Sequence, residues 1–220
     1  MNLSNDFLTL LMEIGVGLEA LTAIVATIYY YKYKNTHVLK YFIFLLWYVA
    51  INEIIGLYIR SENWDNVLLI NIYNVINFTY ILILYRSYLN EKKSKKIALI
   101  LCITYLIIFI INGFYENYFI KFQSIPYIIA AFAVIITISL YFREILNSEK
   151  VLNAKRNLLF WISVGLLIYF VGNIPFRILR NYYNELTDAT ILFLVNFTLT
   201  VIMNICFIIG FIWSKKKQQY

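Results

Sequence analysis

The sequence predicts an all-α polytopic membrane protein, a bundle of seven transmembrane helices in a single domain over residues 1–220. First, 62% of the residues are hydrophobic and only 14% are charged, whereas soluble domains are about half apolar and about a quarter charged. Second, seven apolar segments each approach the roughly 20 residues that cross about 30 Å of hydrocarbon. Third, the connections are short, and helices are the usual way to satisfy backbone polar groups in lipid.

In chain order the predicted spans are residues 7–31, 38–59, 67–89, 97–114, 123–146, 157–181 and 189–213. No Lys or Arg precedes the first span. This span is also too long for the apolar core of a signal peptide and lacks a small-residue cleavage pattern, so we expect a retained helix.

Orientation follows from the distribution of positive charge. Of the 19 lysines and arginines, only Arg60, Lys121, Arg177 and Arg180 lie on the side that holds the N-terminus. The positive-inside rule therefore places the N-terminus outside and the C-terminus in the cytoplasm. The net charge of +7 then reflects the orientation of the chain in the membrane. It also favours contact with an anionic inner leaflet. The predicted cytoplasmic basic contacts are Lys92, Lys93, Lys95 and Lys96.

Polar residues interrupt five of the spans at a similar depth. With a rise of about 1.5 Å per residue, a set of them lies roughly 6–12 Å from the outer ends of their helices: Glu13, Glu53, Asn71, Asn74, Asn173, Arg177 and Asn196. Glu19 and Asn77 lie deeper, at about 15–18 Å. We expect the first, second, third, sixth and seventh helices to surround this ligand-binding site or polar core. The fourth and fifth, apolar inside, should face lipid more.

The charged members of this layer need partners, because an ionised side chain at the bilayer centre costs roughly 2.5–3.5 kcal/mol. Arg177 lies at the depth of Glu13 and Glu53, and we expect it to pair with one or both. Glu19 has no cation at its depth and is expected to be neutral. Pro175 should kink the sixth helix and free the carbonyl of Val171. The asparagines also admit a purely structural interpretation, as hydrogen bonds between helices.

The residue inventory disfavours enzyme classes, so we expect no enzyme. The chain has no HExxH motif, no Gly-rich phosphate loop and a single histidine, His37, in a predicted cytoplasmic turn. Its three aspartates lie in loops or at span ends. Residues 189–213 contain no lysine for retinal. Cys102 and Cys206 form no CxxC pair, so no metal or cofactor is expected.

Several stretches resemble a group of small bacterial seven-transmembrane sensory or accessory proteins. They are EIIGLY (53–58), NVLLINIYNVINF (66–78), RSYLNEKKSKK (86–96) and NLLFWISVGLLIYFVGN (157–173), followed by a seventh span that ends in lysines. The resemblance implies a membrane-embedded module and assigns no activity to particular residues. A weaker resemblance is to multi-span membrane accessories of RNA-targeting CRISPR systems.

We therefore expect a non-enzymatic, receptor-like or accessory module of the bacterial cytoplasmic (inner) membrane. A small ligand or a proton would reach the polar layer from outside, and the sixth helix would pass the change to a cytoplasmic or membrane protein partner. One alternative is a pore-forming or channel-like effector or accessory in CRISPR-associated antiviral defence. Another is a small-solute transporter. The sequence leaves a homo-oligomer open, and nucleic acid is not the expected partner.

Overall fold

The computed structural model describes residues 5–62, 64–178 and 190–216. Within these ranges the chain is helical, with no strand, and seven helices are long and apolar enough to cross a membrane. They are α1 (Asn5–Ile28), α2 (Phe42–Ser61), α3 (Val67–Tyr88), α4 (Lys92–Asn112), α5 (Ser124–Leu146), α6 (Leu158–Ile178) and α7 (Thr190–Trp213). The predicted all-α class and its seven spans are confirmed over these residues. The predicted segments 179–181 and 189 lie outside the described residues.

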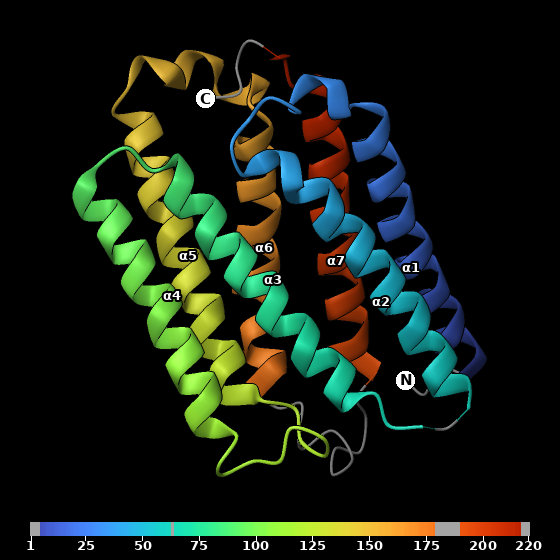
Figure 1. The fold of residues 1–220 in the computed structure, drawn as a ribbon. Coiled ribbons are helices and arrows are strands. Elements are labelled where there is room, and N and C mark those ends of the chain that lie inside the picture. The colour runs from blue at the N-terminus through green and yellow to red at the C-terminus, as the bar shows by residue number, and fades with distance from the viewer. Residues whose placement is uncertain (1–4, 63, 179–189, 217–220) are drawn as a thin grey trace.

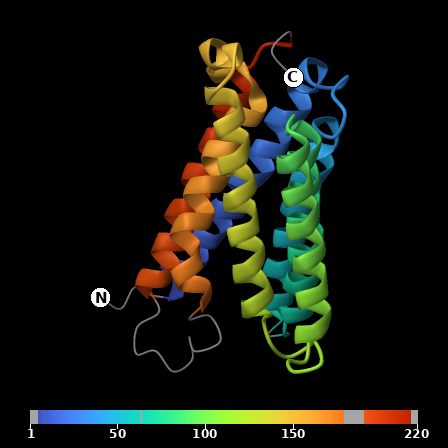
Figure 2. The same cartoon turned by 90° about the vertical axis from the view of Figure 1, so that its left-hand side faces the viewer.

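The helices run alternately up and down, so the two ends of the chain lie at opposite ends of the bundle (Figure 1). We call the end where α1 begins the N-side and the end where α7 finishes the C-side. α1 packs against both α2 and α7, α6 packs on α7, and α3, α4 and α5 form a second group. Figure 2 shows the same bundle turned by 90°.

α5 joins the two groups, because it packs against α3, α4 and α6. Half of its apolar window is buried inside the bundle, against 22% for α4. The expectation that both helices face lipid is therefore wrong for α5. Buried Ala130, Ala131 and Ala133 let neighbouring helices approach it closely. An apolar composition alone does not separate a lipid-facing helix from a central one.

An aromatic cluster holds α3, α4, α5 and α6 together around one buried ring. The Phe78 ring lies 5.6 Å from that of Tyr105, 5.1 Å from that of Tyr127 and 5.3 Å from that of Phe170. Two of these contacts are edge-to-face, the geometry that aromatic quadrupoles favour. These contacts tie α3 to α4, α5 and α6.

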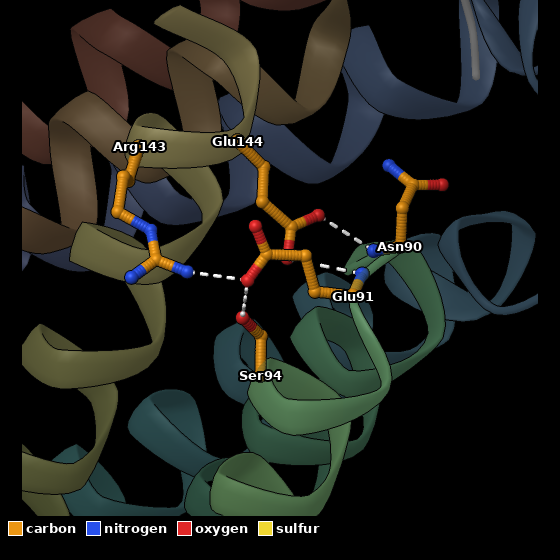
Figure 3. Close-up of polar contacts among 5 residues, drawn as sticks. All are labelled: Asn90, Glu91, Ser94, Arg143 and Glu144. Carbon is orange, nitrogen blue, oxygen red and sulfur yellow. Dashed lines mark hydrogen bonds and ion pairs between the residues drawn. The ribbon is translucent and has the colours of Figure 1, made fainter. Parts of the chain in front are cut away.

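Several span boundaries differ from the predicted ones by a few residues. α2 begins at Phe42, after a 3-10 turn at Leu39–Tyr41, rather than at residue 38. α1 ends at Ile28, before a 3-10 turn at Tyr30–Lys32, rather than continuing to residue 31. α4 begins at Lys92, five residues earlier than the predicted residue 97. At that end Glu144 accepts hydrogen bonds from the backbone N–H groups of Asn90 and Glu91 (Figure 3).

Glu91 completes this start of α4. Its carboxylate accepts from Ser94 and forms an ion pair with Arg143 of α5, at 2.5 Å (Figure 3). Negative charge at a helix N-terminus is favourable, and here it balances the lysines of the first turn. The ion pair is about half exposed at both side chains, so it positions the two helices more than it stabilises them.

Glycines allow α6 and α7 to pack more closely than any other pair. A Cβ at Gly165 would lie 3.1 Å from the carbonyl oxygen of Met203, and one at Gly210 would lie 2.7 Å from the Cβ of Trp161. Small residues at helix crossings give this kind of close backbone approach in membranes. Neither neighbouring atom is the end of a flexible side chain, so the contact has little room to adjust.

Gly210→Ala should therefore destabilise the protein. We expect the melting temperature in detergent to fall by about 3–8 °C, because overpacking costs about 1–3 kcal/mol. The matched control is Gly17→Ala in α1, where nothing lies within 4 Å of the added Cβ. The control should be neutral or slightly stabilising, since Ala favours a helix. Equal melting temperatures for the two variants would contradict the close α6–α7 packing.

Candidate functional site

A cavity of about 550 Å³ lies between α1, α2, α3, α6 and α7. These are the five helices predicted to surround the polar layer, and that arrangement is confirmed; neither α4 nor α5 contributes a lining residue. The charged lining residues are Glu19, Glu53, Arg60 and Arg177. The amides are Asn52, Asn66, Asn74, Asn77, Asn173, Asn196 and Asn204.

The cavity reaches the surface at the N-side, where the exposed side chain of Arg60 lines it. At its other end the lining residues Phe42 and Phe207 are buried, at 1% and 4% exposure. Phe42 and Arg60 lie at opposite ends of α2, separated by about 27 Å of helix rise. The cavity thus extends through most of the bundle and closes toward the C-side.

Four buried aromatic rings close it, and we call them the aromatic plug: Tyr33, Phe42, Phe207 and Phe211. The Phe42 ring lies 5.5 Å from that of Phe207 and 6.4 Å from that of Phe211. The Tyr33 ring lies 5.6 Å from that of Phe211, and its hydroxyl donates to the carbonyl of Ala26 at 2.7 Å. The plug joins α2, α7 and the turn that follows α1.

Lys32 fastens the same turn to α7. Its Nζ donates to the carbonyls of Phe211 and Ile212, both at 2.8 Å, where the C-terminal end of a helix favours a cation. It also lies 4.3 Å from the ring centre of Tyr29. Burial lowers the pKa of Lys32 from its ordinary value. The C-side ends of α1 and α7 are therefore held together directly beneath the plug.

Between the mouth and the plug, pairs of amides and hydroxyls join the helices. Asn173 of α6 donates to the Oδ1 of Asn196 of α7 at 2.7 Å. Deeper in the bundle, Thr22 of α1 donates to the Oδ1 of Asn204 of α7 at 2.7 Å. These bonds support the interpretation that polar residues of these two pairs hold helices together. The Oδ1 of Asn173 is nevertheless buried without a hydrogen-bond partner among the described residues.

Arg177 lies at the N-side wall of the cavity. Its Nη2 donates to the hydroxyl of Tyr169 at 3.3 Å, a contact two turns along α6. Its guanidinium lies over the rings of Phe122 and Tyr127, 5.8 and 5.1 Å from their centres, as cation–π contacts do. Glu53 lines the same cavity, and its predicted pairing with Arg177 stays a prediction.

Glu13 is not part of this cavity, so its predicted place in the polar layer is wrong. It is exposed on the outer face of α1, and the carboxylate of α1 that lines the cavity is Glu19. The two residues are six positions apart, which at about 100° per residue turns them to different faces of a helix. Depth alone therefore misplaced Glu13.

Asn71 also lies away from this cavity, and it holds a loop. Its Nδ2 donates to the carbonyls of Tyr118 and Lys121 at 2.9 and 3.0 Å, and its Oδ1 accepts from the backbone N–H of Gln123 at 3.2 Å. Asn112 of α4 donates to Gln123 Oε1 at 2.6 Å. The α4–α5 loop is thus fixed to α3 by buried amides, and the structural interpretation holds for Asn71.

Pro175 lies inside α6, three residues before its last described residue, Ile178. A kink there would redirect only the final turn, which carries Arg177. Val171 is 56% exposed and does not line the cavity. The prediction that its freed carbonyl adds an acceptor to the polar layer stays a prediction.

Arg60 is a cavity residue that the sequence interpretation missed, because it was counted among the outer loop charges. It lies in the last turn of α2 and contacts the sulfur of Met12. The spacing of residues along the second span could have indicated it, because Glu53, Gly56 and Arg60 are at positions i, i+3 and i+7 and share one helical face. Asn52, inside the predicted second span, and Asn66, just before the third, also line the cavity and were not predicted.

Basic side chains gather at the C-side. Lys92, Lys93, Lys95 and Lys96 are all exposed in the first two turns of α4. Arg86, Lys155, Arg156, Lys215 and Lys216 are exposed at the same end. Within the described residues, no group of three or more His, Cys, Asp or Glu is placed to hold a metal ion.

Comparisons of this chain with protein-family models, curated proteins and solved structures find no match.

Removing the Asn71 amide should loosen the α4–α5 loop. Asn71→Ala deletes three hydrogen bonds at a buried site, so we expect a loss of about 2–3 kcal/mol and a melting temperature lower by about 4–10 °C. Asn35→Ala, at an exposed position of the C-side turn, is the control and should change little. A melting temperature for Asn71→Ala equal to that of the wild type would contradict the assignment.

Proposed function

We propose that this chain is a non-enzymatic, receptor-like or accessory module of a bacterial cytoplasmic membrane. A small solute or a proton enters the cavity from the N-side, which faces outward, and a cytoplasmic or membrane protein partner reads the change at the C-side. The observation that carries this proposal is the one-ended cavity, which has charged and amide side chains in its wall and is closed by the aromatic plug. A binding module needs access from one side only.

Contacts beneath the cavity offer a route for the signal. A solute bound between α1, α2 and α7 would contact the helices whose C-side ends meet at the plug. Lys32 ties the turn after α1 to the last carbonyls of α7, so a relative shift of these helices changes the surface of residues 29–41. This route differs from the expected one through the sixth helix. The exposed lysines of α4 lie at the same end and would contact anionic lipid or the partner.

A small-solute transporter is the second candidate, and the depth of the polar residues favours it. Thr22 and Asn204 carry hydrogen-bonding groups past the middle of α1 and α7, beyond what a shallow outer pocket requires. A transporter would open the plug in part of its cycle. A channel-like defence effector would hold it open when active. Both alternatives require passage through the plug.

Cysteine accessibility separates these functions. In a background with Cys102 and Cys206 replaced by alanine, single cysteines are placed at Gly56, near the mouth, and at Met203, near the plug; both line the cavity. A membrane-impermeant trimethylammonium thiosulfonate should label both from the outside of spheroplasts, and neither in inside-out vesicles. Ile83→Cys, at an exposed position of α3 in the span, is the control and should stay unlabelled.

Labelling of Met203→Cys from both sides would contradict a one-ended cavity and favour a channel or transporter. Failure to label either cavity position from outside would contradict access for a solute altogether.

A further inference from the structure

The deep half of the cavity holds a carboxylate whose contacts are incomplete. The Oε2 atom of Glu19 is shielded from solvent and has no hydrogen-bond partner among the described residues. Glu19 lines the cavity and lies fourteen residues into α1, about 21 Å along the helix. A buried carboxylate oxygen is costly without a donor, so this site is one that a donor from a ligand would complete.

The surroundings of Glu19 add negative rather than positive charge. Glu53 of α2 lines the same cavity. The cavity arginines lie near the N-side instead, Arg60 in the last turn of α2 and Arg177 in that of α6. A solute therefore meets positive charge at the mouth and carboxylates inside.

Toward the plug, the cavity wall becomes apolar. Its apolar lining residues there are Phe42, Leu45, Leu46, Ile81, Leu166, Met203 and Phe207. Asn204 also lines this part, and its amide is occupied by hydrogen bonds with Thr22 and the carbonyl of Thr200. Such a wall accepts a hydrocarbon or aromatic group and offers no partner to a second charge. The volume of about 550 Å³ falls in the ordinary range of small-molecule sites, roughly 300–1,000 Å³.

From these three features we propose that the ligand is a small organic ammonium ion with an apolar body. The ammonium group donates hydrogen bonds to Glu19 and is attracted by Glu53, and the body packs against the apolar wall above the plug. This inference rests on the proposed function, because it names the solute class of the same cavity. A carboxylate ligand would bring no donor to the Glu19 oxygen, whereas an ammonium group carries three.

The test uses the full-length protein in lipid nanodiscs and four probes. Three share a four-carbon chain: n-butylamine as an ammonium ion, butyrate as an anion and n-butanol as a neutral analogue. Phenethylamine is a second ammonium ion, with a larger aromatic body. Isothermal titration calorimetry at pH 7 should give saturable binding for the two amines only. Glu19→Gln should weaken amine binding about 10–100-fold, because a charge-assisted hydrogen bond contributes about 1.5–3 kcal/mol.

Glu13→Gln is the matched control, since it removes a carboxylate from the exposed face of the same helix, and it should bind the amines as the wild type does. Glu19→Asp is the second variant if Glu19→Gln does not fold. It keeps the charge but withdraws the carboxylate, so amine binding should weaken several-fold (less than the full loss of a charged hydrogen bond).

The inference is overturned if the amines do not bind saturably, or if Glu19→Gln or Glu19→Asp binds them as tightly as the wild type. Saturable binding of butyrate or n-butanol without the amines would also overturn it while leaving the solute cavity in place. The proposed function fails separately, through the cysteine labelling described above, because that measurement requires no particular ligand.

Discussion

Polar side chains inside an apolar bundle must be satisfied by the protein or by water, and the arrangement of these helices depends on that constraint. Asn173 and Asn196 satisfy part of it between α6 and α7, as Thr22 and Asn204 do between α1 and α7. Tyr169, Phe122 and Tyr127 surround the guanidinium of Arg177. Glu19, Glu53, Asn74 and Asn77 line a shared cavity, which places the candidate site inside the bundle.

The helices are packed differently around the cavity and at the aromatic plug. Above the plug, five helices stand far enough apart to leave about 550 Å³. At the plug, Phe42, Phe207 and Phe211 fill the same axis with rings. The close glycine contacts of Gly165 and Gly210 keep α7 against α6, so the free space opens toward α1, α2 and α3. Rigid packing on one side of α7 thus helps define the cavity on the other.

The sequence was sufficient for the fold class, because long apolar segments and short connections leave few arrangements in a membrane. It was also sufficient to predict which five helices enclose the polar residues. It did not predict that α5 is central, since lipid and protein interiors select the same apolar residues. The start of α4 at Lys92 depends on Glu144, a residue of α5 that no local pattern connects to it.

Within the site, the depth of a residue along its helix was a useful but incomplete guide. It placed Glu53, Asn74, Asn77, Asn173, Arg177 and Asn196, all of which line the cavity. It failed for Glu13, whose helical face is wrong, and for Asn71, whose amide is used by a loop distant in sequence. Arg60 could have been predicted only by following the helical face of α2 past residue 59, the predicted end of the span. Orientation in the membrane and the identity of the partner stay predictions.

The claim on which the account depends is that the cavity is sealed at the plug, and ion flux tests it most directly. Wild-type protein in proteoliposomes should pass no steady current of small cations, whereas Phe42→Ala combined with Phe207→Ala should leak them. Phe44→Ala, at a residue 65% exposed on α2, is the control and should stay sealed. Steady cation flux through the wild-type protein would contradict the account.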